Sequence, residues 1–314
     1  MMQPMEAVQP GGGFAPVDAC WVCGARALAP VARAIFEFEG YREQDPGLTA
    51  YTGATVDLVR CGECGFGQPR AMPTLPDYFG RMYDQRWSDE WIDSEFHSTA
   101  KDAIFREVLR DLAARVPAGE RTLLDLGAHV GRFIHLAARE GWRAEGVELN
   151  PRTSAYAARA TGLPVHRADL RDLAEEGRRY TAVTLTDVLE HIPEPVGALQ
   201  AVRRVVAPGG WVAVKVPHGP NQLRKELLRA RLRPGYRPTV ADNLVHVSHF
   251  TPRALAIALE RAGFVDVQVR PAAPELFGSR PSRAGRLAAY AASRALGPSS
   301  PLALNLQAYA RAGE

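Results

Sequence analysis

The stretch DLGAHVGRF, residues 125–133, sets the expectation for the fold. It follows an apolar, strand-like run and opens a helix-like segment, so it is interpreted as a loop that leads from a strand into a helix. In an open parallel sheet, ligands bind beyond the carboxyl ends of the strands, and the first such loop is the place to look. Gly127 and Gly131 allow the backbone to come close to a ligand, and a helix that begins near Val130 offers free amides. The spacing is not the GxGxxG of a dinucleotide fingerprint.

Acidic residues at the strand ends narrow the choice of ligand. Asp125, just before the first glycine, would repel a pyrophosphate and attract an ammonium group. Glu148 in GVELN can accept both hydroxyls of a ribose, and Asp169 in RADL can accept the amino group of adenine. Ammonium, ribose and adenine together describe S-adenosylmethionine. His129 stands where a further glycine is expected, and because histidine is enriched at positive φ, we predict that the turn survives with some strain.

The chain after residue 118 alternates between strand-like and helical segments. Seven apolar runs are interpreted as strands, at residues 121–127, 143–149, 163–169, 180–188, 209–216, 264–270 and 302–310. Helical stretches lie between the first six, and an amphipathic helix is expected over 101–115. This order predicts an α/β fold with a Rossmann-like, doubly wound, seven-stranded and mostly parallel sheet.

The cysteines form two CxxC pairs, CWVCG and CGECG. They are Cys20, Cys23, Cys61 and Cys64. Four thiolates in such knuckles, each followed by a glycine, are typical of a tetrahedral zinc site, and the gap leaves room for a hairpin of residues 34–40 with residues 55–61. Two disulfides are disfavoured without a secretory signal, and a redox CxxC would not need a second pair. We therefore predict a structural zinc ribbon over residues 19–70, because zinc adds on the order of 10 kcal/mol to so small a core.

Composition excludes several classes of protein. The chain of 314 residues is 46% hydrophobic and 23% charged, as in ordinary globular proteins, and has no apolar run of about 18 residues that predicts a membrane segment. A net charge of +3 is too small to indicate nucleic-acid binding. Residues 1–18 are expected to be a disordered leader rather than a signal peptide, which makes the cytoplasm the default location.

Two segments depart from the alternation. Residues 219–245 form a basic insertion, which is either a solvated helix face or a lid that attracts an anionic acceptor such as a phosphorylated or nucleotide-linked sugar or a carboxylated metabolite. Its basic residues are Arg224, Lys225, Arg229, Arg231, Arg233 and Arg237. A second segment, SRAGRLAAYAASRAL at residues 282–296, also lies where it can cap or border a site.

Residues 71–117 are expected to form a helical cap or linker. Its aromatic residues are Tyr78, Phe79, Tyr83, Trp87, Trp91 and Phe96. Their spacing partly fits helical faces, which favours packing, with a flap over a ligand as the alternative.

From residue 121 to 270 the chain resembles class I S-adenosylmethionine-dependent methyltransferases. The resemblance rests on DLGAHVGRF, GVELNP, HRADLRDL, LTDVLEHIPEP, VVAPGGWVAVKVP and HVSHFTPRALAIALERAGF. DVLEHIPEP followed by PGGW is similar to the ubiquinone-type O-methyltransferase branch. The paired knuckles and YFGRMYDQRW resemble methyltransferases with an N-terminal zinc ribbon, several of which act on sugars or secondary metabolites. A methyltransferase core over residues 118–314 is therefore expected, with S-adenosylmethionine and a structural Zn²⁺.

The resemblance implies roles for particular residues. Asp125, Gly127, Ala128 and Gly131 would form the loop on the methionine side, Glu148 would bind the ribose, and Asp169 with Leu170 would contact the adenine. The full predicted cofactor set is Asp125, Gly127, Ala128, His129, Gly131, Glu148, Asn150, Asp169, Leu170 and Asp187.

Histidines gather at the predicted ligand edge of the sheet. They are His129, His191, His218, His246 and His249. Methyl transfer is an in-line displacement, so the protein must align the nucleophile and, if it is a hydroxyl, remove its proton. We predict His191 or His246 as the general base, with His249 on the substrate side. Two histidines could instead hold a metal, but the sequence offers no compelling acidic partner.

The predicted function is S-adenosylmethionine-dependent methyl transfer to a small molecule, at a hydroxyl of a sugar or secondary metabolite. Methylation at nitrogen or carbon stays open. A zinc-ribbon binding or scaffold protein with a methyltransferase-like core is the second hypothesis. An NAD-dependent oxidoreductase is disfavoured by Asp125 and by the glycine spacing.

Overall fold

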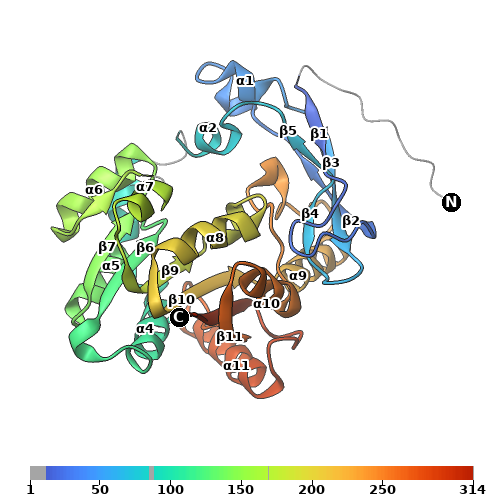
Figure 1. The fold of residues 1–314 in the computed structure, drawn as a ribbon. Coiled ribbons are helices and arrows are strands. Elements are labelled where there is room, and N and C mark those ends of the chain that lie inside the picture. Colours follow the sequence, from blue (N-terminus) through green and yellow to red (C-terminus); the bar gives the residue numbers. More distant parts are fainter. Residues whose placement is uncertain (1–11, 85–87, 169, 314) are drawn as a thin grey trace.

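The computed structural model describes residues 12–84, 88–168 and 170–313 (Figure 1). Its main element is a seven-stranded sheet of order β11-β12-β10-β9-β6-β7-β8. The strands are β6 (Thr122–Leu126), β7 (Arg143–Val147), β8 (Val165–His166), β9 (Tyr180–Thr186), β10 (Val206–Pro217), β11 (Phe264–Pro271) and β12 (Asn305–Ala312). β12 runs antiparallel to both of its neighbours, and the other pairs are parallel. The predicted doubly wound sheet is confirmed.

The third predicted strand is shorter than expected. β8 contains only Val165 and His166, and it pairs with β7 alone at the edge of the sheet. Asp169 lies outside the described residues, and Leu170 is described only as the first residue of α7 (Leu170–Glu175).

Helices cover both faces of the sheet. α4 (Asp102–Ala113), α5 (Arg132–Arg139) and α11 (Arg280–Leu296) lie on one face, and α7, α8 (Pro195–Val205) and α10 (Pro252–Arg261) lie on the other. Leu123 packs into the first layer and Leu124 into the second, because successive side chains of a strand point to opposite faces. α6 (Pro151–Thr161) lies beside β8.

The N-terminal region is built on a small antiparallel sheet of β2 (Leu28–Ile35), β3 (Thr55–Cys61) and β4 (Gly67–Pro69). β3 pairs with residues 28–35, so the hairpin predicted over residues 34–40 is confirmed only for residues 34 and 35, whose partners are residues 56 and 55. Phe36 and Phe38 instead leave the strand pairing and pack their rings in an aromatic cluster with Tyr51 and Tyr78. Burial of these rings outweighs the β-propensity of the segment.

Part of the expected leader is ordered. β1 (Phe14–Pro16) pairs with β5 (Ala71–Pro73), and the Phe14 ring lies edge-on to Phe36 and Tyr51 at centroid distances of 5.4 and 5.3 Å. The prediction of a disordered leader over residues 1–18 is therefore wrong for residues 14–16, because one partly buried aromatic ring anchors a Pro- and Gly-rich stretch. Residues 1–11 lie outside the described part of the chain.

The cysteine region is packed directly against the sheet domain. The ring centroids of Phe66 and Phe250 are 5.0 Å apart, and the Thr251 hydroxyl donates a hydrogen bond to the Cys64 carbonyl at 2.9 Å. Cys20, Cys61 and Cys64 belong to the same hydrophobic cluster as β10 and α10. The cysteine region and the sheet domain therefore share one interior.

The segment between the ribbon and α4 is helical, as expected. It contains α2 (Tyr78–Asp84) and α3 (Asp89–His97). Tyr78 and Phe96 are buried packing residues, whereas Phe79, Tyr83 and Trp91 line a cavity, and Trp87 lies outside the described residues. Packing is therefore confirmed for Tyr78 and Phe96, and the flap over a ligand stays a prediction for the residues that line the cavity.

The basic insertion divides into two parts. α9 (Gly219–Leu232) borders a cavity, whereas the following loop leads to the short helix η4 (Asp242–Leu244) on the N-terminal region. Arg237 pairs with Glu37 at 2.9 Å and with Asp242 at 2.8 Å. The second half of the insertion is thus joined through Glu37 to the segment that follows β2, while Val245 at its end lines a cavity, so a lid over residues 219–245 stays a prediction. No helix in the described ranges has both the length and the apolar character that a membrane span requires.

Candidate functional site

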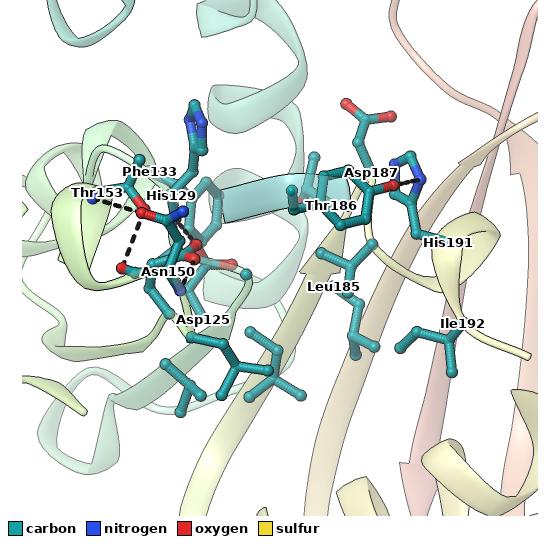
Figure 2. A pocket seen from close by; sticks show the side chains of 18 of the residues that line it. Asp125, His129, Phe133, Asn150, Thr153, Leu185, Thr186, Asp187, His191 and Ile192 are labelled. Atoms are coloured by element: carbon teal, nitrogen blue, oxygen red, sulfur yellow. Dashed lines mark hydrogen bonds between the residues drawn. The ribbon is translucent and has the colours of Figure 1, made fainter. Parts of the chain in front are cut away.

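A cavity of about 1270 Å³ lies over the carboxyl ends of β6, β7 and β9 (Figure 2). The strand order reverses at β6, so this is the position where a doubly wound sheet binds ligands. The predicted cofactor residues that line it are Asp125, Gly127, Ala128, His129, Glu148, Asn150 and Asp187. Gly131 does not line it, and the structure does not describe the side chains of Asp169 and Leu170.

Backbone conformation explains the glycines of the first loop. Gly127 has φ of 68°, and a Cβ there would lie 2.6 Å from a methyl carbon of Val188. Gly131 has φ of 83°, and a Cβ there would lie 3.0 Å from that of Ala157, so this glycine allows α5 to pack against α6. His129 has φ of 51°, which confirms the predicted positive φ at the position of the missing glycine.

Glu148 joins the loops that follow β6 and β7. Its carboxylate accepts hydrogen bonds from the backbone amides of His129, at 2.8 Å, and Asn150, at 2.9 Å. Burial raises the pKa of Glu148, and these amides oppose that shift. Asn150 caps α6, since its side-chain oxygen accepts from the amides of Arg152 and Thr153. A carboxylate can accept about four hydrogen bonds, so Glu148 keeps capacity for hydroxyl donors.

Asp125 is a buried carboxylate with a hydroxyl partner. It is 4% exposed and accepts a hydrogen bond from Thr184 Oγ1 at 2.6 Å. Burial raises the pKa of Asp125 to about 7. A cationic ligand group would stabilise its charged form, as the sequence predicted for an ammonium. Burial and Lys101 lower the pKa of His129 to about 4, so its ring is neutral. The ring lies edge-on to that of Trp91.

Asp187 lies at the other end of the cavity and is held by two lysines. Its carboxylate forms ion pairs with Lys215, which is 2% exposed, and with Lys101 at 3.2 Å. Burial alone would raise the pKa of Asp187, but the two ammonium groups hold it below its usual range. Neither lysine was predicted as a site residue from the sequence. A single lysine in the apolar strand WVAVKVP, residues 211–217, was the signal available for Lys215.

A second cavity of about 440 Å³ adjoins the first. The two share Tyr83, Lys101, Asp187 and His191 in their walls. Glu190 and His246 line only the second. His191 therefore stands at the junction of the two cavities.

The ring of His191 is oriented through one nitrogen. Its Nδ1 lies 2.5 Å from the carbonyl oxygen of Val245 and 2.9 Å from the hydroxyl of Tyr83. A carbonyl only accepts hydrogen bonds, so Nδ1 carries the proton, and in the neutral ring Nε2 then carries the lone pair. This is the tautomer that a general base requires.

His246 lies beside His191, and its pKa is strongly lowered. The two rings are 4.8 Å apart at their centroids and nearly perpendicular. Burial, together with His191 and His249, lowers the pKa of His246 to about 3. A base is most effective when its pKa lies near the working pH, so the lowered pKa of His246 counts against it as the general base.

His249 and His218 lie away from both cavities. His249 is 8% exposed, and its backbone pairs with Gly67 of the ribbon. A Cβ on Gly219 would lie 2.7 Å from the Cβ of His249, so the side chain is enclosed between the ribbon and α9. His218 caps α9, with its Nδ1 accepting from the amide of Asn221 at 3.4 Å. The catalytic role predicted for His249 finds no support in this placement.

Glu190 supplies the acidic neighbour that the sequence analysis did not find for a metal. Atoms of Glu190, His191 and His246 lie within 4.8 Å of one another. Burial and Asp187, however, raise the pKa of Glu190 to about 8, and Lys101 and Lys215 place two positive charges close by. This charge environment opposes a divalent cation and favours a neutral histidine base.

The four cysteines form a second candidate centre. Cys20 and Cys64 place their sulfurs 3.6 Å apart, Cys23 and Cys61 place theirs 3.5 Å apart, and all four lie within 4.8 Å. A zinc–sulfur bond of about 2.3 Å in a tetrahedron requires sulfurs about 3.8 Å apart. The glycines that follow each pair have φ of 80° and 77°. The donor set and its geometry fit zinc.

Comparisons with known proteins agree with this architecture. Residues 96–269 match the methyltransferase domain family. A ubiquinone biosynthesis O-methyltransferase of Paracidovorax citrulli is 32% identical over 134 residues, which cover 40% of this chain and 55% of that protein. One from Cereibacter sphaeroides is 33% identical over 114 residues, which cover 35% and 46%. The chain thus spans about half the length of these relatives.

A solved structure shows the same fold. A putative S-adenosylmethionine-dependent methyltransferase from Listeria monocytogenes has a TM-score of 0.50 at 20% identity, covering 69% of this chain and all of that one. The family match, the strand order and the cavity at the switch point agree with one another. The chain therefore belongs to the methyltransferase domain family and has a class I S-adenosylmethionine-dependent methyltransferase core.

Proposed function

We propose that the protein transfers a methyl group from S-adenosylmethionine to a hydroxyl of a small molecule, a sugar or secondary metabolite. The observation that carries this proposal is the position of His191. It stands where the two cavities meet, with Nδ1 held by the Val245 carbonyl and the lone pair on Nε2. A base of this kind is needed for a hydroxyl nucleophile.

The larger cavity fits the cofactor in the chemistry of its walls. Asp125 would bind the ammonium group, Glu148 would accept hydrogen bonds from the ribose hydroxyls, and Gly127 allows close approach of the backbone. When bound, S-adenosylmethionine supplies a methyl group on a sulfonium sulfur, so a good leaving group is already in place. The protein's own task is then to orient the acceptor, exclude water and take up one proton.

The smaller cavity would hold the acceptor. When the acceptor oxygen takes the methyl group, with cleavage of the carbon–sulfur bond of the sulfonium, Nε2 of His191 would take up the hydroxyl proton. The Val245 carbonyl, which accepts from Nδ1, stabilises the imidazolium that results. Tyr83 keeps the ring in place through its hydroxyl. General base catalysis of this type contributes about 10²- to 10⁴-fold to the rate.

Oxygen is favoured over nitrogen or carbon as the methylated atom. The relatives from two bacteria are named as O-methyltransferases, and a neutral amine would not need the base. A scaffold protein would have no use for buried carboxylates around a cavity of 1270 Å³. We also propose that the four cysteines bind one structural zinc ion, with no part in the methyl transfer.

The test is a screen of candidate acceptors for a mass increase of one methylene. With the acceptor found, His191→Asn is expected to lower kcat by about 10²- to 10⁴-fold and to leave the Kd for S-adenosylhomocysteine unchanged. His97→Asn is the matched control, because His97 is exposed and lines neither cavity. An unchanged kcat in His191→Asn would overturn the assignment of the base.

A further inference from the structure

The outer wall of the smaller cavity contains two cations that differ from those beside His191. Lys225 comes from α9 and Arg286 from α11. Lys101 and Lys215 in the same cavity are paired with Asp187. Neither Lys225 nor Arg286 forms an ion pair with any residue in the described ranges. Two segments that are far apart in the sequence thus bring uncompensated positive charge to one wall.

The nearby acids are engaged elsewhere. Glu226, next to Lys225, accepts from Arg229 at 3.1 Å and from the hydroxyl of Tyr236 at 2.5 Å. Of the acids that line the cavity, Asp187 is paired with Lys101 and Lys215, and Glu275 acts on Lys101, whose pKa it raises together with Asp187. Glu190 is the third, and burial and Asp187 raise its pKa. Burial lowers the pKa of Lys225, and repulsion by Arg229 and Arg286 adds to the shift. An anion at this wall would relieve that repulsion.

Two further observations indicate a ligand rather than a bare charged surface. The guanidinium of Arg286 stacks over the ring of Phe277 at 3.9 Å, which limits its freedom before any anion arrives. Gln222 lines the same cavity, and its side-chain oxygen is buried and has no hydrogen-bond partner among the described residues. It can accept a hydrogen bond from a ligand hydroxyl.

We propose, on the basis of the proposed function, that the acceptor is a small hydroxylated molecule bearing an oxyanion group, a phosphate ester or a carboxylate. Lys225 and Arg286 bind that group while the hydroxyl to be methylated faces His191. Of the six basic residues noted between 219 and 245, only Lys225 lines the cavity. The others lie outside it, so the basic cluster combines a solvated face with one residue that sets specificity.

The test uses inorganic phosphate and acetate as probes on the full chain saturated with S-adenosylhomocysteine. Isothermal titration compares the wild type with the double variant Lys225→Gln and Arg286→Gln. The control pair is Arg231→Gln and Arg233→Gln, which removes the same charge from exposed positions outside the cavity. Saturable binding of one probe in the wild type is expected, at least tenfold weaker in the cavity pair and unchanged in the control pair.

The two probes separate the sources of the oxyanion. Tighter binding of phosphate indicates a phosphate ester, and tighter binding of acetate indicates a carboxylate. The proposal is overturned if neither probe saturates, or if both double variants lose binding equally, as a general surface charge predicts. A failure of the proposed function would show separately, as an absence of S-adenosylhomocysteine binding in the wild type.

Discussion

Two buried aspartates near the ends of β6 and β9 differ in the charge around them. Asp125 has a hydroxyl of Thr184 as its partner, whereas Asp187 has the ammonium groups of Lys101 and Lys215. Asp187 is therefore ionised at neutral pH, while the pKa of Asp125 is raised to about 7. The charge of Asp187 is thus compensated within the fold, whereas a cationic ligand would stabilise the charge of Asp125.

The raised pKa of Asp125 predicts a pH dependence of cofactor binding. Below pH 7 the carboxyl group is mostly protonated, and a ligand ammonium must displace that proton, so affinity should rise as the pH rises from about 5.5 to 8. Isothermal titration of S-adenosylhomocysteine across this range measures it. Asp125→Asn should bind more weakly and lose the slope. Glu260→Gln, an exposed change on α10, should keep the slope, and an identical slope in Asp125→Asn would refute the assignment.

At the scale of residues, the sequence predicted what lies in one loop or at one strand end. Asp125, His129 and Glu148 were found because each follows or ends an apolar run. Tyr83 and Lys101 could not be assigned to the site in this way, because they reach it from the helical cap, whose distance in space from β9 no local pattern records. His249 was misjudged for a related reason, since only tertiary packing shows that the ribbon covers it.

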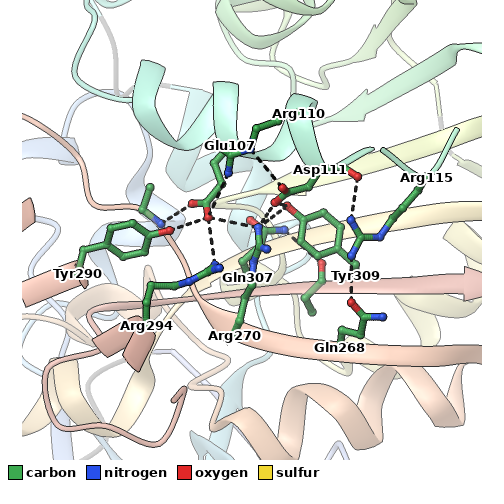
Figure 3. Close-up of polar contacts among 12 residues, drawn as sticks. Glu107, Arg110, Asp111, Arg115, Gln268, Arg270, Tyr290, Arg294, Gln307 and Tyr309 are labelled. Atoms are coloured by element: carbon green, nitrogen blue, oxygen red, sulfur yellow. Dashed lines mark hydrogen bonds and ion pairs between the residues drawn. The ribbon is translucent and has the colours of Figure 1, made fainter. Parts of the chain in front are cut away.

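At the scale of elements, a polar cluster joins α4 to α11 and the edge of the sheet (Figure 3). Glu107 of α4 is buried and accepts from the hydroxyl of Tyr290 at 2.6 Å, from the amide of Ala273 at 2.9 Å and from Arg270 at 3.2 Å. Asp111, one turn later, accepts from Tyr309 at 2.8 Å. This cluster fixes α11, the helix that supplies Arg286 to the smaller cavity.

Removal of the central acid should therefore be costly. Glu107→Ala removes the acceptor of the Tyr290 hydroxyl and of the Ala273 amide, and one of the two acids that pair with Arg270. We expect the free energy of unfolding to fall by about 3–5 kcal/mol. Urea denaturation at pH 7 measures this change. Glu260→Ala on the exposed face of α10 should stay within about 0.5 kcal/mol of the wild type. A loss below about 1 kcal/mol in Glu107→Ala would show that the cluster does not hold α11.

Elements were predicted where the hydrophobic period was clear. All seven strands of the main sheet were found, because each is an apolar run between helical segments. The strand that pairs with β3 begins and ends earlier in the chain than predicted. The alternation in residues 34–40 is as consistent with buried aromatic residues in a loop as with a strand. β1 was missed because three residues in a Pro- and Gly-rich stretch have no measurable period.

At the scale of the whole molecule, the cysteine knuckles and the sheet domain share one hydrophobic cluster. The bridge between Gly67 and His249 and the hydrogen bond from Arg261 to the carbonyl of Val22, at 2.6 Å, add polar contacts across the same boundary. A ribbon that is packed in this way should unfold together with the core and not as a separate unit.

This packing predicts the effect of zinc removal. Elemental analysis should find about one zinc per chain, and a chelator should lower the Tm of a single transition by at least about 10 °C, because zinc binding contributes on the order of 10 kcal/mol to folding. Cys61→Ser should show the lowered Tm in the absence of chelator, and chelator should not lower it further. A separate early transition, or an unchanged Tm after the metal is removed, would contradict the shared interior.

The central claim is that the larger cavity binds S-adenosylmethionine through the acids at the strand ends. Titration of S-adenosylhomocysteine into the wild type and into Glu148→Gln tests it most directly. We expect one site per chain and an affinity at least tenfold lower in the variant, since hydrogen bonds to a charged group contribute about 1.5–3 kcal/mol. Absence of binding in the wild type, or equal affinity in Glu148→Gln, would contradict it.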